Sequence, residues 1–217
     1  MNIVECLTAD ELLSDNTWRR IYKDSFPANE REPLEAILES VQREVGMAFR
    51  ARGPEGTLGL ATTHLLKNPA AVFLVYLAVD QRERSRGIGG ELLQCAWKSG
   101  ATHLRANGLQ PLGLIWEVDP PQPVGNDADT RRRRIAFFQR HGGQLLERPY
   151  LQPPVDGVAA VPMKLMFRPA ASGGPLTSET IEALVRAIYS DKYGAINKID
   201  GALLEGLLIE RGFVARI

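Results

Sequence analysis

Cysteine and histidine are scarce in this chain, whose 217 residues include two cysteines, Cys6 and Cys95, and three histidines. Two thiols are too few for the disulfide framework on which small secreted proteins depend. Cys95 falls within a helical pattern, where a small buried thiol packs well. No histidine stands at zinc-ligand spacing from a cysteine. We therefore expect neither a disulfide framework nor a metal site.

Long apolar runs and an excess of one charge are also missing. No apolar stretch approaches the roughly 20 residues that cross a bilayer. Residues 1–6 lack the basic and apolar regions of a signal peptide. The 26 basic and 26 acidic residues cancel, so no overall field attracts nucleic acid or an anionic membrane. We expect a soluble cytoplasmic protein with neither of these partners.

The chain does have an apolar content of 44%, enough for a sizeable core. Strand patterns are spaced along it at residues 2–6, 46–52, 57–66, 71–79, 112–118, 144–151 and 158–167. Helical patterns alternate with them at residues 9–26, 32–44, 89–104 and 131–140. This alternation predicts an α/β fold.

Residues 169–175, Pro-Ala-Ala-Ser-Gly-Gly-Pro, have the composition of a linker. Two amphipathic helical patterns follow, which predict a C-terminal helical hairpin. We therefore divide the chain into a domain of residues 1–168 and an extension of residues 169–217. We expect the extension to pack on the domain or on a second copy of the chain, as in a homodimer, rather than to do chemistry.

The most informative segment joins the apolar strand at residues 71–79 to the helix that follows. Gly87, Gly89 and Gly90 allow the chain to turn tightly and to expose successive N–H groups. These groups stand at a helix N-terminus, where unpaired donors and the helix dipole favour an anion. Arg84 and Arg86 add guanidinium groups suited to phosphate oxygens. The segment therefore predicts a phosphate-binding turn.

Other glycine-rich motifs fit this turn less well. A Walker loop would place Lys-Ser or Lys-Thr after its last glycine, whereas Gly89 is followed by Gly90 and Glu91. A dinucleotide-binding fingerprint would need the spacing G-x-G-x-x-G. A helix entry with a few glycines and no ligand is the remaining alternative. Strand, arginines, glycines and helix in this order argue against it.

The spacing Arg84-x-x-Gly87-x-Gly89 resembles the R/Q-x-x-G-x-G/A signature of the GNAT N-acetyltransferases. The preceding residues 77–80, Leu-Ala-Val-Asp, are also similar to the family pattern. The resemblance extends over residues 1–168 and implies a GNAT-like fold. Such a fold has a mixed, twisted sheet of about seven strands, flanked by helices. The C-terminal helices have no counterpart in the minimal family fold.

The resemblance implies acetyl-CoA as the co-substrate. Backbone groups of the fourth strand would bind the pantetheine arm, and the turn would hold the pyrophosphate. The implied residues are Leu77, Ala78, Val79, Arg84, Ser85, Arg86, Gly87, Ile88, Gly89 and Gly90. In this family the fourth and fifth strands part, and the acyl thioester reaches the acceptor amine through that gap.

Direct acyl transfer needs a neutral amine, a polarised thioester carbonyl and a proton for the departing thiolate. Glu117 is the candidate base. It lies in residues 115–119, Ile-Trp-Glu-Val-Asp, which are similar to a segment of ribosomal-protein acetyltransferases whose glutamate serves as a base. The alternative is a solvated strand carboxylate. Asp119 lies on the same strand face and is a weaker substitute.

The acid is where this chain departs from the family. Many relatives have a tyrosine where Phe138 stands, and Phe138 has no proton to donate. Arg131 also replaces the asparagine usual at the start of that helix. Tyr150, at the end of an expected strand near the acceptor, is our candidate replacement. Tyr76 and solvent are the alternatives, and His141 beside Gly142 suits a helix C-terminus instead.

Residues 26–33, which we call the acceptor loop, join the first two helices and cover the acceptor site in GNAT proteins. Glu30 and Glu32 in this loop would attract a cationic amine, although a solvated loop is the alternative. The run of arginines at residues 131–134 lacks interleaved aromatic residues for nucleic acid. A solvated helix face with Asp127 and Asp129 as partners is favoured, and contact with a CoA phosphate is the alternative.

Together these observations predict transfer of an acetyl group from acetyl-CoA to a primary amine of a small molecule or peptide. The amine would attack directly in a ternary complex. Two other functions stay open at this point. One is transfer of another acyl group, and the other is an acyl-CoA-binding regulatory module without turnover.

Overall fold

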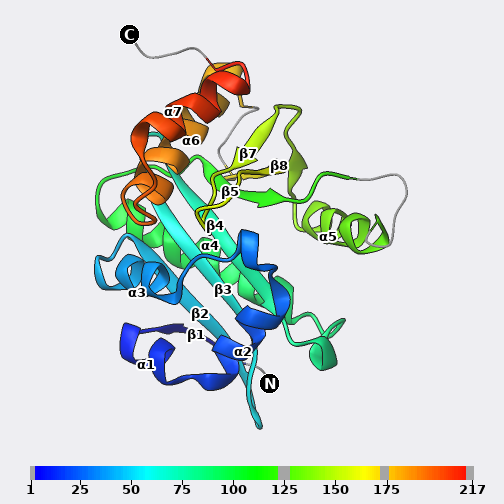
Figure 1. The fold of residues 1–217 in the computed structure, drawn as a ribbon. Coiled ribbons are helices and arrows are strands. Elements are labelled where there is room, and N and C mark those ends of the chain that lie inside the picture. Colours follow the sequence, from blue (N-terminus) through cyan, green and yellow to red (C-terminus); the bar gives the residue numbers. More distant parts are fainter. Residues whose placement is uncertain (1–2, 122–127, 172–175, 214–217) are drawn as a thin grey trace.

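The structure, a computed structural model, describes residues 3–121, 128–171 and 176–213. It is an α/β fold in which helices cover both faces of one sheet (Figure 1). Its strands are β1 (Ile3–Leu7), β2 (Gly46–Gly53), β3 (Gly56–Lys67), β4 (Ala70–Val79), β5 (Gly113–Val118), β6 (Gln144–Leu145), β7 (Tyr150–Gln152) and β8 (Val161–Pro169). Their order is β1-β2-β3-β4-β5-β8-β6, with β7 paired to β8.

The expected mixed sheet is confirmed, and the described residues form eight strands rather than about seven. All neighbours are antiparallel except β4 and β5, which are parallel. The extra strand arises because the strand expected at residues 144–151 is divided into β6 and β7. Pro149 lies in the interruption and has no N–H to donate to the ladder with β8.

Helices flank the sheet at the expected places. They are α1 (Ala9–Ser14), α2 (Asn16–Ser25), α3 (Leu34–Gln42), α4 (Ile88–Ala106), α5 (Ala128–Arg140), α6 (Ser178–Ala187) and α7 (Gly201–Glu210), with short turns η1 (Ala28–Glu30) and η2 (Gln81–Glu83) and a π-helical segment η3 (Ile188–Gly194). The helix expected at residues 9–26 is divided at Asp15, which ends α1 and caps α2 by accepting from the Trp18 N–H.

Three apolar clusters hold these layers together. One joins α4 and α5 to one face of the sheet, with Leu92 and Phe138 among its buried residues. A second joins α1, α2 and α3 to the opposite face around Trp18. The third joins the C-terminal helices to β4, β5, β7 and β8 around Phe73 and Tyr189. The extension therefore packs on the sheet of its own chain, one of the two arrangements that the sequence predicts.

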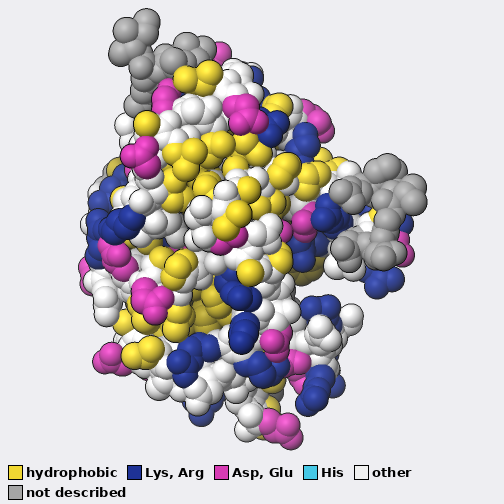
Figure 2. Space-filling view, viewed as in Figure 1, with side chains coloured by type: hydrophobic (Ala, Val, Ile, Leu, Met, Phe, Trp, Pro, Cys, Tyr) yellow, Lys and Arg dark blue, Asp and Glu magenta, His cyan; other side chains and the backbone are white. Residues whose placement is uncertain are grey.

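The surface carries both signs of charge. Figure 2 shows basic and acidic side chains interspersed on one face of the molecule, with apolar side chains gathered near the C-terminal helices. No helix of the described part of the chain combines the length and apolar character needed to cross a membrane. Residues 172–175 of the expected linker lie outside the described residues.

Two features of β4 open the sheet at its centre. Its pairing with β5 is confined to residues Val72, Phe73 and Leu74, which face Leu114, Ile115 and Trp116. On its other side, Thr62 and Thr63 of β3 face Tyr76 and Leu74, so that Val75 is an extra residue. Such a bulge bends the strand. Beyond Leu74, β4 therefore separates from β5.

Candidate active site

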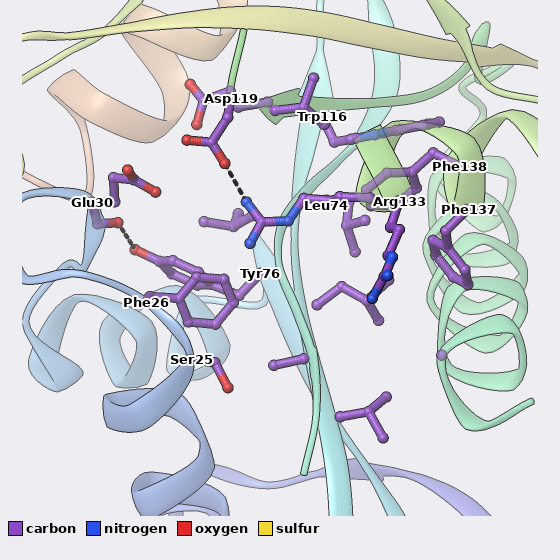
Figure 3. Close-up of a pocket in the computed structure, with 18 of the residues that line it drawn as sticks. Ser25, Phe26, Glu30, Leu74, Tyr76, Trp116, Asp119, Arg133, Phe137 and Phe138 are labelled. Atoms are coloured by element: carbon purple, nitrogen blue, oxygen red, sulfur yellow. Dashed lines mark hydrogen bonds and ion pairs between the residues drawn. The ribbon is translucent and has the colours of Figure 1, made fainter. Parts of the chain in front are cut away.

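A cavity of about 740 Å³ lies where β4 and β5 separate. Its walls are the second half of β4, the start of α4, the end of β5, one side of α5, the acceptor loop and η3 (Figure 3). Ligand sites usually have volumes of about 300 to 1,000 Å³ and gather a few polar groups on apolar walls. The cavity is of this kind and joins the glycine-rich turn to Glu117.

The turn before α4 forms one end of the cavity. Ser85 and Gly87 are left-handed, with φ of 65° and 84°. The Gly87 carbonyl accepts from the N–H groups of Gly90 and Glu91 at 2.9 and 3.2 Å. The N–H groups of Ile88 and Gly89 precede these bonds and have no acceptor within the helix. Left-handed residues followed by a helix N-terminus are the backbone geometry of an anion-binding concavity.

Gly89 and Gly90 also allow α5 to approach this turn. A Cβ at Gly89 would lie 3.3 Å from the Phe137 ring, and one at Gly90 would lie 2.7 Å from Cε1 of His141. His141 thus packs beside the helix start. Burial lowers its pKa, and the charges of Arg168 and Arg140 lower it further, which keeps the ring neutral. The sequence predicted the turn but not this packing.

The arginines near the turn point in different directions. Arg84 lines the cavity, with its Nε 3.5 Å from the Val79 carbonyl oxygen. Arg86 is ion-paired with Glu83 at 2.7 Å and does not line the cavity. The structure therefore brings only Arg84 of the two predicted arginines to this site.

The arginine run on α5 is divided between two roles. Arg132 pairs with Asp129, which fits the expected solvated face, and Asp127 lies outside the described residues. Arg133 extends from α5 into the cavity (Figure 3) and has no ion-pair partner among the residues that the structure describes. Arg140 lines the same cavity. Two cations from α5 thus face the space beside the α4 turn.

Glu117 lies on β5 just beyond the last residue paired with β4. It is half-buried and accepts hydrogen bonds from two phenols. The Tyr193 hydroxyl lies 2.8 and 2.9 Å from its two oxygens, and the Tyr150 hydroxyl donates to Oε1. The solvated carboxylate considered as an alternative is therefore wrong.

The surroundings of Glu117 raise the pKa of its carboxyl group to near neutral pH. Burial raises its pKa to about 7, the two tyrosine hydrogen bonds act to lower it, and the charges of Glu30 and Glu32 raise it further. Burial and the Glu117 charge hold the pKa of Tyr150 and of Tyr193 well above the ordinary value. Both phenols are therefore protonated donors, while Glu117 exchanges its proton near neutral pH.

The two tyrosines differ in their access to the cavity. Tyr193 lines it, whereas Tyr150 is buried behind Glu117 and does not. Sequence reasoning missed Tyr193, which lies in η3 of the extension. The spacing of Tyr189 and Tyr193 indicates one face of a helix, but a π-helical segment changes which face each residue occupies.

Tyr76 has a structural role in the acceptor loop. Its hydroxyl donates to the Glu30 carbonyl at 2.9 Å (Figure 3) and accepts from the Glu32 N–H at 2.8 Å. The Tyr22 hydroxyl donates to the Glu32 carbonyl at 2.9 Å. These bonds fix the loop against β4, and they occupy the group that we considered as an alternative acid.

The two candidate acceptor carboxylates have different environments. Glu30 lines the cavity, and its pKa is raised by burial and by Asp119, although Arg134 and Arg131 partly oppose this. Glu32 lines the cavity as well, but it is buried, ion-paired with Lys192, and accepts from Asn197 at 2.8 Å. The solvated loop is therefore wrong for Glu32. Lys192 already compensates its charge.

Phe138 and Asp119 complete the site. Phe138 is buried against Trp116, with ring centroids 4.8 Å apart, so it places no proton donor at the tyrosine position of the family. Asp119 pairs with Arg134 and, at 3.5 Å, with Arg131. These two cations hold Asp119, the substitute base, against α5.

Comparisons with known proteins bear on the fold. No family model matches the chain, and no curated protein matches it. Among solved structures, a GNAT-family acetyltransferase of Bacteroides thetaiotaomicron has 24% identity and a TM-score of 0.66, with 88% of this chain and 98% of that chain covered.

Two further structures have lower identity. NAA60 of Arabidopsis thaliana, in complex with a bisubstrate analogue, has 15% identity and a TM-score of 0.57, covering 80% and 100% of the two chains. The ribosomal-protein-S18-alanine N-acetyltransferase of Escherichia coli has 17% identity and a TM-score of 0.51, covering 82% and 99%. The fold of this chain is that of the GNAT acetyltransferases.

Proposed function

We propose that the protein is an N-acetyltransferase that transfers an acetyl group from acetyl-CoA to a primary amine. One observation supports this most directly. Glu117, a carboxyl group that titrates near neutrality, lies where β4 and β5 part, in the same cavity as the anion-binding turn. Acylation of an amine by acetyl-CoA needs a site that binds the phosphates of the donor and a base that reaches the amine. The cavity contains a candidate for each.

Acetyl-CoA would bind along β4 and the turn. The backbone edge of β4 from Leu77 to Val79 faces the cavity where β5 no longer pairs with it. The N–H groups of residues 85–90, with Arg84, would hold the pyrophosphate. NAA60, one of the proteins of similar fold, has been solved with acetyl-CoA. Acetyl-CoA would supply the activated acyl group.

Glu117 would act as the base. Its ionised carboxylate would take a proton from the acceptor, since only a neutral amine can attack the thioester. The amine nitrogen forms a bond to the acyl carbon, the carbon–sulfur bond breaks, and the thiolate takes up a proton. A cationic amine loses two protons in all: Glu117 takes the first and releases it to solvent, and the second, lost as the amide forms, balances the proton that the thiolate takes up. Tyr150 would act through its hydrogen bond to Glu117.

The acceptor would be a cationic amine of a small molecule or peptide. Glu30 lines the cavity on the side of the acceptor loop and would attract such a group. Glu32 would contribute less, because Lys192 compensates its charge. Phe26, Val155 and Met163 add apolar surface, which favours acceptors with an apolar group beside the amine.

A thiol-release assay tests this proposal. Acetyl-CoA is offered with a panel of amines: small alkyl and aromatic amines, peptides with a free N-terminus, and peptides with only a lysine amine. We expect release with at least one acceptor class and a loss of about 10² to 10⁴-fold in the Glu117→Gln variant. Binding of acetyl-CoA without turnover on any amine would leave the regulatory module as the function. Faster thiol release with longer acyl-CoAs than with acetyl-CoA would mean that the protein transfers another acyl group.

A further inference from the structure

The segment η3 is the only part of the described C-terminal extension whose side chains line the cavity, through Lys192 and Tyr193. It is a π-helical segment of seven residues between α6 and α7. π-Helical segments are rare in proteins, and those that exist frequently lie at functional sites.

We infer that η3 completes the active site, with Tyr193 positioning the base Glu117 and Lys192 fixing the acceptor loop through Glu32. The inference deepens the proposed function and rests on it. Neighbouring residues of a helical segment point in clearly different directions. One short segment can therefore hold two carboxylates in different walls of the cavity.

Tyr193 is itself held firmly. Its side chain is 2% exposed, and its ring packs against Phe73 and Tyr189 at centroid distances of 6.5 and 6.2 Å. The hydroxyl is shared between both oxygens of Glu117. A rigid donor bridging both oxygens fixes the plane of the carboxylate, so one rotamer of Glu117 faces the acceptor.

Lys192 ties η3 to the acceptor loop. Its side chain and that of Glu32 are each 2% exposed and form an ion pair. The His64 ring hydrogen-bonds the backbone of Asp191, and burial lowers its pKa to about 3, so it adds no charge beside Lys192. The acceptor loop, which contains Glu32, also presents Glu30 to the cavity. Lys192 therefore fixes the acceptor wall.

Four ionisable groups act on Glu117. Tyr193 from η3 and Tyr150 from β7 favour its ionised form, and Glu30 and Glu32 from the acceptor loop oppose it. Without the Tyr193 hydroxyl, only the Tyr150 phenol still favours the ionised form of Glu117, while the two carboxylates continue to oppose it. The pKa of Glu117 then rises, and the base is ionised only at higher pH.

The test uses the Tyr193→Phe variant and the pH profile of kcat/KM for acetyl transfer. We expect its acid limb to move up by about one to two pH units, the value of a hydrogen bond to a charged group. Activity at pH 7 then falls about five- to fiftyfold and is recovered at high pH. Tyr189→Phe is the matched control, because its hydroxyl donates to the Leu151 carbonyl and not to Glu117. Its acid limb stays in place.

A second measurement does not depend on turnover. The carboxyl carbon of Glu117, labelled with ¹³C and assigned with Glu117→Gln, is titrated by NMR in the wild-type and Tyr193→Phe proteins. A higher midpoint in the variant supports the positioning role even if no amine is acetylated, in which case only the proposed function fails. Equal midpoints and equal acid limbs in the two proteins would overturn the inference.

Discussion

Opposing effects meet at one residue, Glu117. Burial and two neighbouring carboxylates favour its neutral form, while hydrogen bonds from Tyr150 and Tyr193 favour its ionised form. The balance places its pKa at about 7, where the group can both accept and release a proton. A carboxyl group with more hydrogen bonds would be a weaker base. One with fewer would be protonated at neutral pH.

The raised pKa of Glu117 also makes the fold depend on pH. In the unfolded chain the group has its ordinary pKa of 4.5, and in the folded protein about 7. The folded state therefore binds the proton more tightly. The stabilisation is complete below about pH 4.5 and is lost as the pH rises through 7, a difference of about 3 kcal/mol.

Comparison of the wild-type protein with Glu117→Gln measures this effect. All other titrating groups are shared, so the difference between their free energies of unfolding isolates Glu117. Urea unfolding between pH 5 and 8 is expected to show the wild type losing about 2.5 kcal/mol relative to the variant, because part of the effect is already lost at pH 5. If the free energies of unfolding of the two proteins changed with pH in parallel, Glu117 would not be desolvated in the folded protein. The same titration predicts that acetyl transfer declines as the pH falls through about 7.

At this scale the sequence predicts some residues and not others. Glu117 was predicted because its neighbours along the strand resemble a known segment. Phe138 was correctly read as unable to donate a proton, and it packs against Trp116 instead. Tyr193 and Lys192 were missed because their partners, Glu117 and Glu32, lie far away in the sequence. Local patterns contain no information about such pairs.

Among the elements, the turn before α4 depends on backbone conformation. Gly87 has φ of 84° and nothing within 4 Å of a Cβ placed on it. Alanine there meets no steric obstacle, but the left-handed conformation costs it about 1–2 kcal/mol. Relaxation of this strain would turn the N–H groups of residues 85–90 away from the cavity.

We predict that Gly87→Ala weakens binding of acetyl-CoA about tenfold or more, measured by calorimetric titration. Gly108→Ala is the control. Gly108 has φ of 77°, has nothing within 4 Å of its Cβ position, and follows the other end of α4. Both variants lose similar stability, but Gly108→Ala keeps its affinity. Equal affinity losses would show that acetyl-CoA does not bind at the turn.

The contact between η3 and the acceptor loop gives a second prediction at this scale. Lys192→Met leaves the Glu32 charge buried and unpaired, which is expected to cost about 3–5 kcal/mol of stability. Addition of Glu32→Gln removes that charge and recovers most of the loss. Urea unfolding of the single and double variants measures both steps.

Lys198→Met supplies the control for this pair. Lys198 pairs with Glu39 at 2.8 Å, with side chains 62% and 35% exposed. An ion pair as exposed as this one contributes little to stability. If Lys192→Met lost as little stability as Lys198→Met, water would reach Glu32, and η3 would not hold the acceptor loop.

Elements with strong patterns were predicted well. The apolar run at residues 71–79 is β4, and the stripe from residue 89 is α4. Two expected elements were each divided, one at Asp15, whose side chain caps a new helix, and one at Pro149, which cannot pair. Both residues were visible in the sequence, but the hydrophobic periodicity continues across them and predicted one unbroken element in each case.

On the scale of the whole molecule, a neutral chain contains a polarised cavity. Its 26 basic and 26 acidic residues cancel overall. Several charged groups of the cavity lining are compensated in ion pairs, namely Glu83 with Arg86, Asp119 with Arg134 and Glu32 with Lys192. Outside these pairs, Arg84, Arg133 and Arg140 line the cavity near the α4 turn, and Glu30 and Glu117 line it near the acceptor loop. The two ends suit an anionic donor and a cationic acceptor. Local placement, not net charge, therefore selects the ligands.

This polarity predicts how salt affects binding of acetyl-CoA. Arg133 lines the cavity and has no ion-pair partner among the described residues, so its charge is available to a phosphate. Arg133→Gln is expected to weaken binding about threefold to tenfold at low salt. Added salt screens this interaction over a Debye length of about 8 Å at physiological ionic strength. The variant's dissociation constant should therefore rise less steeply with salt than that of the wild type.

Arg132→Gln is the matched control, since the neighbouring side chain pairs with Asp129 and does not line the cavity. Its affinity and salt dependence should equal those of the wild type. Calorimetric titrations at several salt concentrations measure both variants. If both weaken binding equally, the cavity attracts acetyl-CoA through the general field of α5. A selective effect of Arg133→Gln would mean that one guanidinium group on α5 contacts the ligand, so that the donor spans the cavity from the α4 turn to α5.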